Sequence, residues 1–79
     1  MRIDKFLKVS RIIKRRTIAN EAADNGRISV NGKVVKPSYD IKVNDIVEIK
    51  FGNQISKFKI TAIPTKQSAR TDEVAEMVD

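Results

Sequence analysis

The spacing of the apolar residues changes at Gly26, and this change divides the chain into a helical first part and a second part made of strands. Before Gly26, apolar residues recur at intervals of three and four positions, which is typical of amphipathic helices. After Gly26 they alternate with polar residues, as in strands that bury one face. The pattern therefore predicts an α+β fold with two packed helices on a small antiparallel sheet of about four to five strands.

Two short helices are expected, over residues 4–12 and 16–24. Asp4 suits the N-cap or the first turn, because an acid there meets the positive end of the helix dipole. Asn25 and Gly26 end the second helix, since glycine readily adopts the left-handed conformation that follows a helix. Alanines line the second helix, so the two helices can approach each other closely.

Turn residues delimit the expected strands. Asn31-Gly32 is a strong signal for a two-residue hairpin turn, because both residues tolerate positive φ. Further turns are expected near Tyr39, Asn44 and Gly52, and Pro64 stops the last strand. These positions predict strands over residues 27–30, 33–35, 46–51 and 54–63.

Residues 65–79 follow a different pattern from the rest of the chain. They begin with a polar stretch without a period, and residues 71–78 predict a short acidic helix with Thr71 as its N-cap. A helix this short is marginal on its own. We therefore expect one folded domain at residues 1–64 and a flexible, acidic C-terminal tail at residues 65–79.

Basic residues are concentrated in the first half of the chain. The formal net charge is +6, and residues 1–36 hold ten Lys or Arg against three Asp or Glu. Residues 2–16 alone carry seven of the sixteen basic side chains beside one acid. Like charges this close repel one another, so an external anion is expected to stabilise them, and a nucleic acid fits that description.

The composition argues against an enzyme, a metalloprotein and a membrane protein. The chain has no His and no Cys, so catalysis by these residues and thiolate metal sites are excluded. Its glycines form neither a Walker loop nor a dinucleotide-binding fingerprint, so no cofactor is expected. No apolar run is long enough to cross a bilayer. We expect a cytoplasmic, monomeric protein without enzymatic activity.

The sharpest candidate site is the run Lys14-Arg15-Arg16, where the second helix begins. Cations at a helix N-terminus oppose the helix dipole by about 0.3–1 kcal/mol each, so folding alone would favour acids there. A phosphate at that position would be attracted by the cations, the dipole and the free N–H groups together. The alternative reading is a solvated basic turn.

Other basic residues extend this candidate site. A stripe of the first helix, beside its apolar face, carries Lys5, Lys8 and Arg11. Lys33 and Lys36 flank the hairpin, where lysine can also protect a sheet edge. The full set of candidate nucleic-acid-binding residues is Arg2, Lys5, Lys8, Arg11, Lys14, Arg15, Arg16, Lys33 and Lys36.

Several short pieces of sequence follow one another in a fixed order between residue 2 and about residue 52: Arg2-Ile3-Asp4-Lys5-Phe6-Leu7, Ser10-Arg11, Ala19, Gly26-Arg27-Ile28, Val30-Asn31-Gly32, Lys36-Pro37-Ser38 and Asn44-Asp45. Together they resemble the signature of the S4 RNA-binding domain family. Two positions depart from the family pattern: Arg15 stands where many members have Ser or Thr, and Asn44 stands where Gly is usual. Because Asn tolerates the left-handed conformation, the turn at Asn44 is expected to persist.

This resemblance implies that structured RNA binds on the helical face of the fold. It is strongest to the small stand-alone bacterial members of ribosome-associated quality control, with the heat-shock-induced S4 protein as a near relative. It implies a factor that binds ribosomal RNA and tRNA on the large ribosomal subunit during rescue or quality control of stalled nascent chains. A nascent-chain tailing factor is a further implied partner. Position by position, Arg2, Lys5, Arg11, Arg15 and Arg16 fall in the RNA-facing part of the signature.

The residues alone leave two other functions open. A pair of helices with a basic junction also suits duplex DNA, as in a small DNA-binding regulator. Alternatively, the basic face could meet an acidic protein, as in a protein-interaction module.

Overall fold

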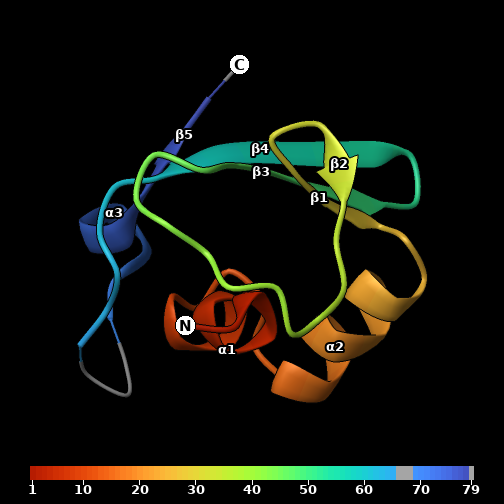
Figure 1. Cartoon of the computed structure of the whole chain (residues 1–79), viewed down its shortest axis with the longest axis horizontal. Helices are drawn as coiled ribbons and strands as arrows, with labels where there is room; N and C mark the ends of the chain where they lie inside the picture. Colours follow the sequence, from red (N-terminus) through yellow and green to blue (C-terminus); the bar gives the residue numbers. More distant parts are fainter. Residues whose placement is uncertain (66–68, 79) are drawn as a thin grey trace.

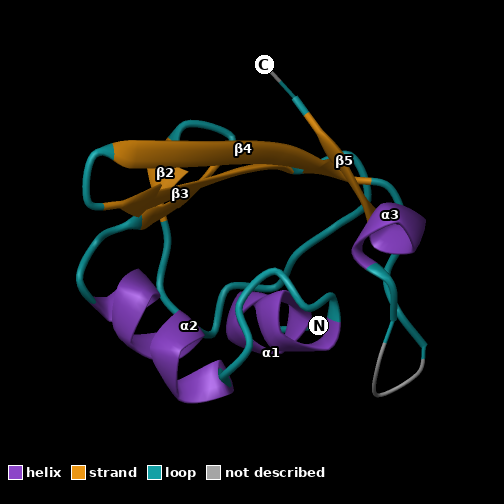
Figure 2. Ribbon diagram, turned by 180° about the vertical axis from the view of Figure 1, so that it is seen from behind, coloured by secondary structure: helices purple, strands orange, loops and turns teal. Residues whose placement is uncertain are grey.

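The computed structural model describes residues 1–65 and 69–78, which form two layers. Helices α1 (Ile3–Val9) and α2 (Arg16–Asp24) lie on the same side of an antiparallel sheet in both views (Figures 1 and 2). The sheet has the strand order β2-β1-β3-β4-β5. Its strands are β1 (Ile28–Val30), β2 (Lys33–Val34), β3 (Ile46–Phe51), β4 (Gln54–Ile60) and β5 (Ala75–Met77). The predicted α+β fold is confirmed.

The core lies between α1 and the central strands. Phe6 of α1 stacks on Phe58 of β4, with ring centroids 6.3 Å apart and an interplanar angle of 18°. Val47 and Ile49 of β3 are fully buried, as the alternation along this strand predicts. Phe51, which shares their face, reaches the end of the sheet and is 40% exposed, so the buried face stops before the strand does.

The predicted turns form where the sequence places them. Asn31 (φ 52°) and Gly32 (φ 85°) both have positive φ, which the two-residue hairpin between β1 and β2 requires. The Asn31 side chain also accepts a bond from the Ile46 N–H at 3.0 Å and donates to the Asp45 carboxylate at 3.1 Å. Asn44 has φ 78°, as expected from its tolerance of this conformation.

α2 spans the predicted residues, but α1 ends at Val9 instead of near residue 12. Arg11 has φ 65°, a left-handed conformation that cannot continue a helix of L-residues. Ile13 is nevertheless buried, because the chain turns back at this point and its N–H donates to the Leu7 carbonyl at 3.0 Å. Arg11 therefore does not extend the stripe of cations on α1.

The segment after residue 68 packs onto the domain, in contrast to the flexible tail expected from the sequence. The Ala69 N–H donates to the Val9 carbonyl at 3.0 Å, and the Thr71 hydroxyl donates to the Ser10 carbonyl at 2.5 Å. These bonds satisfy carbonyl groups that the end of α1 leaves without helical partners.

This segment continues as helix α3 (Thr71–Val74) and then as β5, so the expected helix over residues 71–78 is only one turn long. Ala75–Met77 pair with β4 instead, and Val74 and Ala75 enter the core at 3% and 8% exposure. The N-cap of α3 is Arg70, one residue before the expected Thr71. Residues 66–68 and 79 of the expected tail lie outside the described residues.

Candidate nucleic-acid interface

A buried carboxylate joins the two helices at the start of the candidate site. Asp4 is only 1% exposed and accepts bonds from the Asn20 amide at 3.2 Å and from the Lys5 N–H at 2.7 Å. The guanidinium groups of Arg2 and Arg16 lie 3.2 Å and 3.5 Å from its two oxygens. We call these four residues, Arg2, Asp4, Arg16 and Asn20, the Asp4 cluster. Asp4 is therefore a bridge between α1 and α2, and the N-cap of α1 is Arg2.

The Asp4 cluster keeps its carboxylate ionised. Burial acts to raise the pKa of Asp4, but the hydrogen bonds from Asn20 and Lys5 and the charges of Arg16 and Arg2 outweigh it. The pKa of Asp4 consequently lies below its ordinary value. The side chains of Arg2 and Arg16 remain 50% and 46% exposed. Since a guanidinium has five N–H donors, each arginine keeps donors directed at solvent.

The two helices differ in how their first N–H groups are satisfied. At the start of α1, the Ile3 N–H donates to the Tyr39 carbonyl at 2.8 Å and the Asp4 N–H to the Pro37 carbonyl at 3.3 Å. At the start of α2, the N-cap Arg15 makes no side-chain capping bond. The first residues of α2, Arg16, Thr17 and Ile18, are exposed, and among the described backbone bonds their N–H groups have no partner outside the helix. These N–H groups and the positive end of the helix dipole are therefore open to solvent.

Further cations surround this uncapped helix start. Lys5 and Lys8 of α1, together with Val9 and Arg16, line a hollow of about 300 Å³. Lys14 and Arg15 are exposed and form no ion pair with the described residues. We call the six cations of this region the basic face: Arg2, Lys5, Lys8, Lys14, Arg15 and Arg16.

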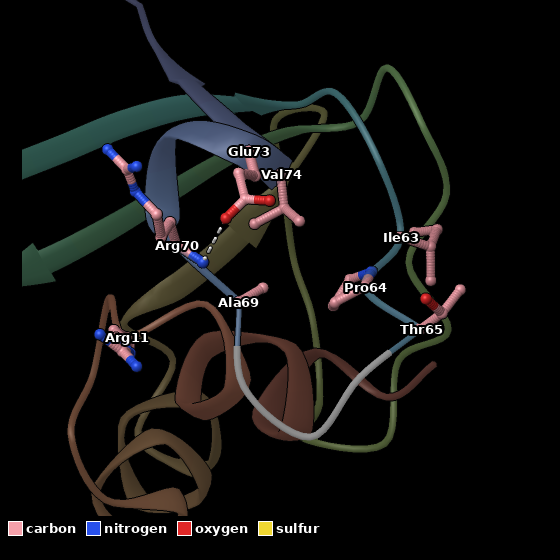
Figure 3. A pocket seen from close by; sticks show the side chains of 8 residues that line it. All are labelled: Arg11, Ile63, Pro64, Thr65, Ala69, Arg70, Glu73 and Val74. Carbon is pink, nitrogen blue, oxygen red and sulfur yellow. Dashed lines mark hydrogen bonds between the residues drawn. The ribbon is translucent and has the colours of Figure 1, made fainter.

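Arg11, a predicted site residue, lies at a different hollow. In Figure 3 it faces the C-terminal segment, across from Arg70, where the Glu73 carboxylate accepts a bond from the Arg70 backbone N–H at 3.2 Å. This hollow measures about 280 Å³ and is also lined by Pro64 and Val74. The left-handed backbone of Arg11 turns the chain toward this side of the molecule.

The two predicted site residues of the hairpin lie on different parts of the fold. Lys33 is exposed on β2, the edge strand at one end of the sheet. Lys36 is exposed in the loop whose next residue, Pro37, accepts the Asp4 N–H bond. The loop carrying Lys36 therefore borders the Asp4 cluster, whereas Lys33 belongs to the sheet edge.

Sequence reasoning missed one neighbour of the basic face. Arg2, Asp4 and Arg16 share a hollow of about 420 Å³ with the polar α2 residues Thr17, Asn20 and Glu21. Asn20 is linked to both arginines through Asp4, because its amide donates to the carboxylate beside which they lie. Its position four residues after Arg16 on one helix face was the available signal.

The described residues contain no group of three or more His, Cys, Asp or Glu that could hold a metal ion. Within the same residues, no helix is long and apolar enough to span a membrane.

Comparison with known proteins finds similarity along the whole chain. Residues 1–47 match the family model of the S4 domain. The RQC P-site tRNA stabilizing factor of Streptococcus pneumoniae is 54% identical over 79 residues, which cover 100% of this chain and 88% of that protein. The factor of the same name from Bacillus subtilis is 47% identical and covers 98% and 87% of the two chains. Heat shock protein 15 of Escherichia coli is 32% identical over 95% of this chain and 56% of its own length.

Two solved structures share the fold. Heat shock protein 15 of Vibrio cholerae, described as trimeric, superposes with a TM-score of 0.88 at 21% identity, over 99% of this chain and 81% of that chain. The solution structure of the hypothetical protein HP1423 superposes with a TM-score of 0.85 at 28% identity, over 100% and 98% of the two chains.

Proposed function

Because this chain belongs to the S4 domain family, and within it to the group of the RQC P-site tRNA stabilizing factors, we propose that it is a non-catalytic RNA-binding factor of the ribosome. Its ligands are ribosomal RNA and tRNA on the large ribosomal subunit. Its role is the rescue or quality control of stalled nascent chains, in the cytoplasm, as a monomer that also meets a nascent-chain tailing factor.

One observation carries this proposal: the start of α2 is uncapped and surrounded by six cations. The N–H groups at this start, the helix dipole and the basic face all favour a bound anion at one place. In the absence of an anion, three consecutive cations there oppose the dipole, and of these three only Arg16 forms an ion pair with an acid of the described residues. A bound RNA phosphate offsets this unfavourable interaction, because its negative charge attracts both the cations and the positive end of the dipole.

The Asp4 cluster gives the site its geometry. Asp4 holds Arg2 and Arg16 from one side, so their remaining donors point outward in a fixed arrangement instead of sampling many rotamers. Fixed guanidinium groups lose less conformational entropy when they bind a phosphate. RNA helices hide their base edges in a deep, narrow major groove, so such a site recognises backbone shape more than sequence.

Charge reversal at Arg15 tests this function, because it separates folding from binding. Arg15→Glu places an acid at the start of α2, where the dipole favours it, so the free energy of unfolding should not fall. A lost charged hydrogen bond of about 1.5–3 kcal/mol should weaken binding to large ribosomal subunits by about tenfold or more in co-sedimentation.

Lys50→Glu is the matched control. Lys50 is exposed on β3, and its replacement by Glu changes the net charge by the same amount as Arg15→Glu. Equal retention of both variants on large subunits would contradict the proposal. Stronger retention on duplex DNA than on ribosomal subunits would favour the DNA-binding alternative.

A further inference from the structure

The last strand of the sheet leaves an open edge. β5 pairs with β4 on one side, and no strand of the described chain covers its other side (Figure 2). An open edge presents backbone N–H and C=O groups that can pair with an added strand. The edge is held in place, because Val74 and Ala75 are buried and Thr71 is bonded to Ser10.

The register shows which backbone groups face outward. The Val78 N–H donates to the Lys57 carbonyl at 3.0 Å, so Val78 directs its backbone toward β4. In an antiparallel ladder alternate residues face opposite sides, so Met77 directs its N–H and C=O away from β4. The Met77 side chain is 70% exposed beside these groups.

A hollow with an acidic rim adjoins this edge. It measures about 480 Å³ and is lined by Thr61, Thr71, Asp72, Ala75, Glu76 and Met77, with no Lys or Arg among them. The Glu76 carboxylate forms no ion pair with the described residues, and Lys59 is its cross-strand neighbour outside the lining. The ion pair of Asp72 with Arg70 is exposed at 69% and 73%.

We propose that the β5 edge and this hollow form a docking site for an extended protein segment that carries Lys or Arg side chains. The segment adds a strand to β5, its cations meet Glu76 and Asp72, and an apolar side chain covers Met77. The acidic rim repels phosphate groups, so this site does not suit RNA. The proposal is independent of RNA binding by the basic face.

The test is a nuclear magnetic resonance titration of the full chain with an eight-residue peptide of alternating Lys and Val. The amide signals of Thr61 and of Ala75–Met77 should shift. Glu76→Lys should weaken the peptide affinity at least fivefold, whereas Asp24→Lys, the same charge change at an exposed position of α2, should leave it unchanged.

A proline variant tests strand addition itself. Met77→Pro removes an N–H that faces away from β4, so the ladder with β4 persists while the edge loses its donor. We expect it to abolish peptide binding, and Met77→Ala to weaken binding less. Thermal unfolding checks that each variant is folded. If the proline variant does not fold, the effect of Glu76→Lys on peptide affinity tests the docking site instead.

Three results would overturn the proposal: no shifts at β5, peptide binding that is unaffected by both Glu76→Lys and Met77→Pro, or shifts at β5 on adding duplex RNA. A peptide of alternating Glu and Val should produce no shifts. Since duplex RNA reports on the basic face in the same spectra, failure of the docking site and failure of RNA binding are distinguishable.

Discussion

Replacing Asp4 with Asn removes the negative charge at the centre of the Asp4 cluster while keeping the size of the side chain. An amide NH2 group replaces one carboxylate oxygen, and this group donates hydrogen bonds instead of accepting them. The bonds from Asn20 and Lys5 and the attraction of both arginines then compete for one remaining oxygen. Every donor loses its charged acceptor, and the single neutral oxygen that remains has fewer acceptor sites than the carboxylate had.

The size of the effect follows from burial. A hydrogen bond to a charged group contributes about 1.5–3 kcal/mol, and each half-exposed arginine contributes only about 0.2–1 kcal/mol because water screens it. The Asn retains part of these contacts, so we expect Asp4→Asn to lower the free energy of unfolding by about 1–3 kcal/mol. For a domain of this size each kcal/mol lowers the melting temperature by about 4–8 °C.

The assay is urea denaturation of wild type and Asp4→Asn between pH 7 and pH 2. The pKa of Asp4 is lowered in the folded state, so its contribution is complete above the ordinary pKa of about 3.8 and is lost as the pH falls through the folded value. The difference between the two proteins should therefore be largest at neutral pH and shrink below about pH 4.

Asp40→Asn is the control, because Asp40 is exposed and its pKa is also lowered, mainly by a hydrogen bond from the N-terminal ammonium group. We expect a smaller loss of stability there than at Asp4. Equal stability of wild type and Asp4→Asn at pH 7, or a difference that stays constant down to pH 2, would refute the reasoning.

Two further substitutions test the local structure by thermal unfolding. Thr71→Val removes the hydroxyl that donates to Ser10, so it should cost about 1 kcal/mol, while Thr71→Ser should cost less; equal melting temperatures would show that this bond does not hold the C-terminal segment. Asn44→Ala should cost about 1–2 kcal/mol because φ is 78°, whereas Asn44→Gly should be neutral or stabilising; an unaffected alanine variant would contradict this account of the turn.

The features that sequence reasoning predicted well are those set by neighbouring residues. The helix α2 follows from its alanines and from the Gly26 that ends it, and the β1–β2 hairpin follows from Asn31-Gly32. Each of these signals acts within a few residues, so the tertiary structure had little to add.

The features that it missed depend on distant residues. The burial of Asp4 requires Asn20 from the next helix, and the carbonyl groups at the end of α1 accept bonds from Ala69 and Thr71, some sixty residues further along. The spacing of Val74, Met77 and Val78 suits a helix. Ala75–Met77 instead pair with β4, and this strand pairing overrides the local preference for a helix.

The central claim is that the basic face binds RNA phosphates, and the salt dependence of affinity for large ribosomal subunits tests it most directly. Each neutralised phosphate contributes about 0.7–0.9 to the slope of log affinity against log salt, so six cations predict a slope of about −4 to −5. Lys8→Gln should make the slope shallower by about 0.7–0.9. Lys50→Gln should leave it unchanged. A flat slope, or the same slope in Lys8→Gln as in wild type, would contradict the claim.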